Sequence, residues 1–187
     1  NPDAEGFLFK TDNEKLNAIV EAARQTFKQN ALDILTDCPS RERAGWLCDS
    51  YFLGKSEQLF TGKNKVERNF LNNYIHAKTQ SIPEEMVAMC YPADFTDGSY
   101  IPNWALFYII EQYDYYLRCG DDTILKKSKD RICKILKFFE KYLNEQGLLE
   151  NLENWVFVEW SKANDPEFTA GINYPSNMLY AMALECT

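Results

Sequence analysis

The feature that most constrains the fold is an alternation between two kinds of predicted helix. Three segments carry their apolar residues on one stripe at helical spacing, which indicates helices with one face in solvent: residues 13–29, 64–79 and 122–146. The other three are apolar on more than one side, which indicates buried helices: residues 49–61, 103–119 and 175–187. The two kinds follow one another in turn. This order predicts an all-α fold of paired outer and inner helices, as in half of an α/α barrel.

The links between these helices differ in length in a matching way. The links from an inner helix to the next outer helix, 61–63 and 120–121, are very short, and each contains a glycine that stops the helix. The links from an outer to an inner helix are long: 30–48, 80–102 and 147–174. Antiparallel helices place all the long links at one end of the layer. Long loops on a rigid scaffold are where sites usually lie, so this end is the predicted site.

Composition bounds the class of protein and its partners. The chain has 187 residues, so we expect residues 1–187 to form a single helical domain. A formal net charge of −8 argues against nucleic acid as a partner, because binding phosphates needs a basic face. No stretch reaches the ~20 apolar residues of a membrane span. Six cysteines without a Cys-x-x-Cys pair and a single histidine predict no metal site, and we expect no cofactor.

The most distinctive stretch is Asp37-Cys38-Pro39-Ser40-Arg41-Glu42-Arg43-Ala44-Gly45-Trp46-Leu47-Cys48-Asp49. Pro39 and Gly45 argue against a continuous helix, so carboxylates, arginines and an indole meet in a loop. Two interpretations are open at this point. The loop is either a structural element whose Arg–Asp pairs fix the start of a helix, or a polar site for a neutral, hydroxyl-rich ligand. In the second case one carboxylate can be tuned as a general acid.

This stretch resembles the signature of bacterial α-L-rhamnosidases, glycoside hydrolase family 78. The likeness is carried by Asp37-Cys38-Pro39-x-Arg41-Glu42-Arg43-x-Gly45-Trp46 and Asp49. The segments Ile101-Pro102-Asn103-Trp104 and Trp155-Val156-Phe157-Val158-Glu159-Trp160 look like two further motifs of the family, although Glu159 stands where the family often has Asp. With the helix upstream of Asp37, nearly the whole chain is covered. The resemblance implies an (α/α)6 toroid, of which this chain would hold about the first six of twelve helices.

The resemblance also implies an activity and site residues. The activity is release of terminal α-L-rhamnose from glycans or glycosides by an inverting mechanism that uses two carboxyl groups. The general acid falls on Glu42, and substrate hydroxyl contacts fall on Asp37 and Asp49. Tryptophans in the long links can stack on the C–H faces of a sugar. The complete substrate-binding set that we predict is Asp37, Arg41, Trp46, Asp49, Trp104, Glu159 and Trp160.

The charges around Glu42 conflict with a proton-donor role. Glu42 lies between Arg41 and Arg43, and cations nearby lower the pKa of a carboxyl group, whereas a general acid needs a raised one. The conflict is eased if the arginines point away, toward Asp37 or Asp49, and Glu42 lies against an indole. The family's general base belongs to the second half of its barrel, and no residue here matches it. We therefore expect this chain alone to be catalytically incomplete.

Partners and alternatives follow from the same expectation. The chain begins without Met and ends inside an apparent helix, so we expect it to be a piece of a longer protein. Either the remainder of the parent chain or a second copy would cover its inner helices. The compartment, bacterial cytoplasm or periplasm, stays open. Two other functions also stay open: a non-catalytic carbohydrate-binding or interaction domain, and a related (α/α)6 hydrolase that acts on another sugar.

Overall fold

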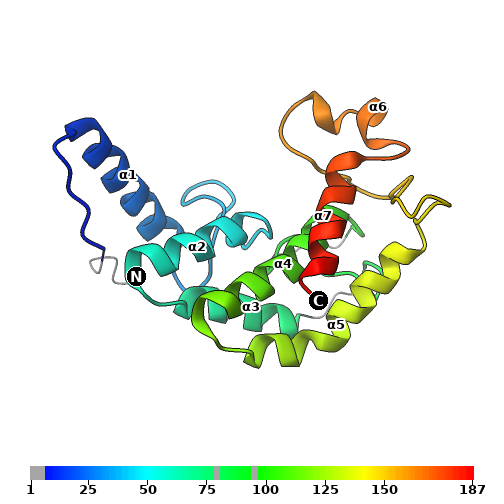
Figure 1. The fold of residues 1–187 in the computed structure, drawn as a ribbon, viewed down its shortest axis with the longest axis horizontal. Helices are drawn as coiled ribbons and strands as arrows, with labels where there is room; N and C mark the ends of the chain where they lie inside the picture. The colour runs from blue at the N-terminus through cyan, green and yellow to red at the C-terminus, as the bar shows by residue number, and fades with distance from the viewer. Residues whose placement is uncertain (1–6, 78–80, 94–96) are drawn as a thin grey trace.

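The structure, a computed structural model, describes residues 7–77, 81–93 and 97–187. The helices in these ranges are α1 (Glu14–Asn30), α2 (Asp49–Thr61), α3 (Lys65–His76), α4 (Pro102–Cys119), α5 (Thr123–Glu140), η1 (Lys162–Asn164), α6 (Pro166–Thr169) and α7 (Tyr174–Glu185). Bridges between extended backbone segments in the described ranges are isolated and form no strand. The predicted all-α class is therefore confirmed. Figure 1 shows the helices in a curved arrangement, with α1 at its left side and α5 and α7 at its right side.

Helix starts and stops follow local side-chain chemistry. The Asn13 side chain accepts a hydrogen bond from Leu16 N at 3.2 Å and caps α1. Gly62 and Gly120 end α2 and α4 in the left-handed conformation, as the sequence predicts. The predicted helix 122–146 is too long, because α5 ends at Glu140. Beyond it, the Asn144 side chain accepts from the backbone N–H groups of residues 146 and 148, which favours a turn over more helix.

The predicted order of outer and inner helices is present, but the inner helices are not equally covered. The central inner helix α4 packs against α2, α3, α5 and α7 and is buried along most of its length. The flanking inner helices keep apolar side chains in solvent, among them Phe52 on α2 and Met178 on α7, which is 74% exposed. Of the inner helices that the sequence predicted to need a covering partner, α2 and α7 are therefore barer than α4. Within the described ranges, no helix combines the length and apolarity needed to cross a bilayer.

The short links meet at one end of the helix layer. Gly62 and Asn64 from the α2–α3 link line one groove together with Cys119 at the end of α4 and Asp121 from the α4–α5 link. An ion pair joins α3 to the α4–α5 link, with 3.1 Å between Arg68 Nε and Asp121 Oδ2. The long links lie at the other end, where they form the cleft described below.

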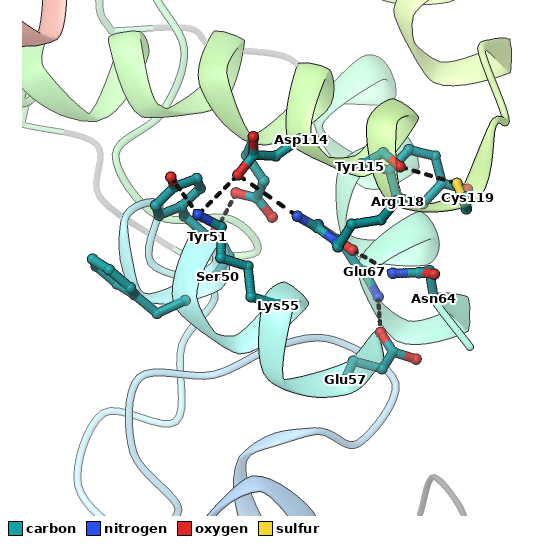
Figure 2. Close-up of polar contacts among 12 residues, drawn as sticks. Ser50, Tyr51, Lys55, Glu57, Asn64, Glu67, Asp114, Tyr115, Arg118 and Cys119 are labelled. Atoms are coloured by element: carbon teal, nitrogen blue, oxygen red, sulfur yellow. Dashed lines mark hydrogen bonds and ion pairs between the residues drawn. The ribbon is translucent and has the colours of Figure 1, made fainter. Parts of the chain in front are cut away.

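A buried polar cluster joins α2, α3 and α4 (Figure 2). Glu67 on α3 is fully buried, forms an ion pair with Arg118 of α4, and accepts from Asn64 Nδ2 at 3.0 Å. Burial nevertheless raises the pKa of Glu67. Glu57 on α2 accepts from two backbone N–H groups in the first turn of α3, at 2.9 and 2.8 Å, and so caps that helix. The cluster fixes the three helices relative to one another through directional bonds.

Candidate active site

The loop between α1 and α2 is closed by Asp37. Its backbone N–H donates to Ala44 O at 3.1 Å, and its Oδ1 accepts from Ala44 N at 3.0 Å. Arg43, just before this closure, has a positive φ of 54°, which is uncommon for a residue with a side chain. We call residues 37–49 the motif loop. Its first carboxylate therefore shapes the backbone that carries the other functional groups.

Gly45 lets the motif loop lie directly on the protein core. The Tyr74 hydroxyl and the Tyr91 backbone N–H both donate to Gly45 O, each at 3.0 Å. A Cβ atom at position 45 would lie 2.2 Å from Tyr91 O and 2.9 Å from a ring carbon of Phe70. Only glycine permits this close approach. The motif loop is thus fixed against α3 and the 86–93 segment.

The motif loop passes into α2 through a strained residue. Cys48 has φ 76° and ψ −57°, the geometry of a rare and strained γ-turn. The backbone is held on both sides of it, because Leu47 N donates to Met89 O at 3.0 Å and Ser50 N donates to Trp46 O at 3.2 Å. Asp49 follows as the first residue of α2, where a carboxylate is favourably placed at the positive end of the helix dipole.

Glu42 is paired with its neighbour in the sequence. Arg41 Nη2 lies 2.5 Å from Glu42 Oε1, and the side chains are 83% and 36% exposed respectively. The Glu42 N–H donates to Cys38 Sγ at 3.3 Å. The idea that Arg41 points away toward Asp37 or Asp49 is therefore wrong for this structure. Exposed ion pairs are worth no more than about 1 kcal/mol, so this contact is easily exchanged.

Aromatic side chains from the start of α4 and from the third long link form a wall of the cleft beside the motif loop. Trp104, in the first turn of α4, packs edge-on against Phe157, with ring centroids 5.0 Å apart. Phe157 in turn contacts Trp160 at 5.0 Å and Trp155 at 5.7 Å. Trp160 is 82% exposed and so presents its ring to solvent. Asn164 holds this segment, since its Oδ1 accepts from the backbone of residues 158 and 159 at 2.7 and 3.2 Å.

The motif loop and the aromatic wall enclose one cleft of about 650 Å³. All eight side chains predicted from the sequence line it: Asp37, Arg41, Glu42, Trp46, Asp49, Trp104, Glu159 and Trp160. They come from the first and third long links and from the first turns of α2 and α4, and Ile101 at the end of the second long link lines the cleft as well. The three long links therefore meet at one end of the helix layer, as their lengths predicted. The roles assigned to the individual residues stay predictions.

The electrostatics of the cleft are dominated by its carboxylates. Burial, together with the nearby negative charge of Asp37 and, to a smaller extent, of Glu42, raises the pKa of Asp49 to about 6. Burial and the Asp49 charge raise the pKa of the Cys48 thiol to about 12, so this cysteine is a protonated, unreactive wall residue near neutral pH. A pocket with four carboxylates and an apolar aromatic wall suits a neutral ligand with several hydroxyl groups.

The sequence did not single out every residue of the cleft. Ile101, Cys48, Phe157, Val158 and Trp155 also line it. Phe157 and Trp155 belong to a segment that the sequence had marked, and alternate residues of an extended segment share a face. Trp160 and Glu159, however, both reach the cleft, so simple alternation does not describe the segment. The Asn164 contacts that bend this segment involve a residue outside the motifs, so they carried no signal in the sequence.

Comparison with known proteins identifies the class. A family model described as the bacterial alpha-L-rhamnosidase 6 hairpin glycosidase domain matches residues 4–187. A curated alpha-L-rhamnosidase from Formosa agariphila is 21% identical over 167 residues, which is 85% of this chain and 18% of that protein. The chain belongs to the bacterial α-L-rhamnosidase six-hairpin glycosidase family. The resemblance inferred from the motifs is therefore confirmed.

Solved structures support the fold. The chain is similar to a GH78 family rhamnosidase of Bacillus sp. GL1, with a TM-score of 0.86 and 24% identity over 99% of this chain and 19% of that one. It is also similar to a rhamnosidase from Klebsiella oxytoca with rhamnose bound, with a TM-score of 0.72 and 16% identity over 98% of this chain and 40% of that one. The chain thus has the fold of a fragment of an all-α toroid. The chain spans about a fifth of the length of the Formosa and Bacillus proteins.

Proposed function

We propose that this chain is the N-terminal half of a six-hairpin barrel that removes terminal α-L-rhamnose from glycans or glycosides. The observation that supports this proposal most is the convergence of three long links on one cleft that holds Asp37, Glu42 and Asp49 opposite an aromatic wall. Family membership supports the substrate class. The similar Formosa and Bacillus proteins are both rhamnosidases, which supports the same substrate class.

In the proposed mechanism Glu42 is the general acid that protonates the departing glycosidic oxygen. Glu42 must then release Arg41 and carry a proton when substrate fills the cleft. The Arg41 side chain is mostly exposed, so it can move without disturbing the core. Asp37 and Asp49 would accept hydrogen bonds from the hydroxyl groups of the sugar. Trp160 and Trp104 would stack against its C–H faces.

An inverting reaction needs a second carboxylate, about 6.5–9.5 Å from the acid, to activate water. We propose that this base is supplied by the part of the parent protein that follows the present chain. Exposed apolar side chains support such a continuation, because α7 presents Tyr174 and Met178, and α2 presents Phe52 and Leu59. A large exposed apolar surface usually marks an interface that another part of the protein or another chain covers. Without the rest of the barrel, we expect the isolated chain to self-associate through α2 and α7.

The test compares the full-length parent with the isolated chain on an aryl α-L-rhamnoside. We expect turnover by the parent and none by the isolated chain, with proton NMR showing the β anomer of rhamnose as the first product. Turnover by the isolated chain would contradict the missing base. Rhamnose binding by the parent without turnover would favour a binding domain. Turnover of an aryl α-D-glucoside instead of the rhamnoside would move the proposal to another sugar.

A further inference from the structure

Glu111 is a buried carboxyl group that the proposed mechanism does not use. It lies in the middle of α4 and is fully buried. Its Oε2 accepts a hydrogen bond of 2.6 Å from the Ser50 hydroxyl, and Ser50 is itself fully buried. Its Oε1 is buried and has no hydrogen-bond partner among the described residues. A lone buried acid with one directed contact calls for an explanation, because an unpaired polar atom in a core is costly.

The cations near Glu111 are already engaged elsewhere. Arg118 forms its ion pair with Glu67, and its other amino group lies 3.7 Å from Asp114 (Figure 2). Lys55 lies 2.9 Å from Asp114. Burial, reinforced by the nearby Glu67 charge, raises the pKa of Glu111 well above its ordinary value. The raised pKa favours the neutral, protonated form of Glu111 over the charged one.

The partner of Glu111 lies beside the cleft. Ser50 is the second residue of α2, directly after Asp49, and both follow the strained Cys48. A strained backbone persists only where its surroundings hold it on both sides. On the N-terminal side of Cys48, the backbone is fixed by the hydrogen bond from Leu47 N to Met89 O. On the C-terminal side, the Ser50 side chain is fixed by its hydrogen bond to Glu111, and this bond joins α2 to α4.

We propose that Glu111 is a positioning residue that, through Ser50, holds the first turn of α2 so that Asp49 faces the cleft. The inference rests on the proposed function in so far as Asp49 binds substrate. Ser50 and Glu111 never touch the sugar. Their effect is on the place of the Asp49 carboxylate, and a displacement of about 1 Å at such a site can cost up to about a hundredfold in rate.

The experiment uses the full-length parent with four variants. Ser50→Ala removes the hydroxyl, and Ser128→Ala is its matched control, since Ser128 is equally buried and accepts a single bond of 3.1 Å from the Tyr108 hydroxyl. Glu111→Leu removes the acceptor, whereas Glu111→Gln keeps an acceptor and the shape. For each variant we measure the melting temperature, kcat and KM on an aryl α-L-rhamnoside, and hydrogen exchange in the peptide that covers residues 46–54.

We expect Ser50→Ala and Ser128→Ala to lower the melting temperature alike, while only Ser50→Ala lowers kcat/KM, by roughly tenfold or more. Glu111→Gln should stay within about twofold of wild type, and Glu111→Leu should behave as Ser50→Ala or fail to fold. Faster exchange at residues 46–54 should accompany Ser50→Ala alone. Equal kcat/KM for the two serine variants would overturn the proposal, even if Glu111→Leu does not fold.

The two proposals fail in distinguishable ways. If the wild-type parent does not hydrolyse the rhamnoside, the proposed function is wrong, and hydrogen exchange alone decides the positioning role. Faster exchange in the first turn of α2 for Ser50→Ala, but not for Ser128→Ala, would then still support it. The same exchange in both variants would contradict it.

Discussion

Replacing Asp49 by asparagine should stabilise the protein near neutral pH. The pKa of Asp49 in the folded chain is about 6, against an ordinary value of 3.8. Below about pH 4 the carboxyl is protonated in both the folded and the unfolded state, so it costs nothing. As the pH rises from 3.8 to about 6, the unfolded state ionises while burial and the Asp37 charge keep the proton on the folded state, so stability is lost across this range and the full loss remains above pH 6. Asparagine mimics the protonated carboxyl and avoids this loss.

The magnitude follows from the difference between the two pKa values. A difference of about 2 corresponds to about 3 kcal/mol for a fully buried group. Asp49 is partly exposed at the cleft, so solvent screening reduces the expected gain to about 1–1.5 kcal/mol. For a domain of this size, this gain raises the melting temperature by roughly 2–6 °C. The gain should be present at pH 7.5 and absent at pH 4.

The assay is thermal unfolding followed by tryptophan fluorescence at the two pH values. Asp130→Asn, which changes an exposed carboxylate on α5, is the matched control and should show no such pH-dependent gain. The reasoning would be refuted if Asp49→Asn destabilised the protein at pH 7.5, or if its effect were the same at both pH values. A stabilised variant with weakened rhamnoside binding would mean that Asp49 is kept for function at the expense of stability.

Three further predictions follow from the packing of the cleft and the helix cluster. Gly45→Ala should lower the free energy of unfolding in urea by about 3 kcal/mol, because the new Cβ would lie 2.2 Å from Tyr91 O. A loss below about 1 kcal/mol would contradict this close approach. Gly54→Ala should lower the free energy of unfolding by about 1 kcal/mol, because the clash of a Cβ only 2.3 Å from a Glu67 carboxylate oxygen outweighs the better helix propensity of alanine. A more stable variant in the same assay would show that Glu67 can move aside. Trp160→Ala should leave the melting temperature nearly unchanged, because this side chain is exposed, yet raise KM for a rhamnoside by roughly tenfold in the full-length parent. Trp160→Phe should keep most of the affinity. An unchanged KM for Trp160→Ala would remove Trp160 from the substrate site.

The fold was largely predictable because the spacing of apolar residues indicates which faces of a helix are buried. The segment 103–119 is apolar on all sides, and α4 is the most enclosed helix of the chain. Link length was equally informative, since it predicted which ends of the helices meet. The overlong prediction for 122–146 has a local cause, because Asn144 binds backbone N–H groups beyond α5. Periodicity alone does not reveal this competition.

The membership of the cleft was predictable, but its internal pairing was not. Motif residues such as Glu42 and Trp104 stand out in the sequence and come together because their links share one end of the layer. The Arg41–Glu42 contact depends on how the motif loop bends after Asp37, which the residue order does not state. The Ser50–Glu111 bond joins residues 61 positions apart, and neither residue belongs to a recognised charged pattern. Contacts of this kind depend on how α2 docks on α4.

The central claim is that Glu42 donates the proton to the leaving group. The most direct test is Glu42→Gln in the full-length parent, measured on a natural rhamnoside and on an aryl rhamnoside with a good leaving group. We predict a loss in kcat of about a hundredfold or more on the natural substrate and a much smaller loss on the activated one, which needs little protonation. An equal loss on both substrates would contradict the assignment of Glu42 as the general acid.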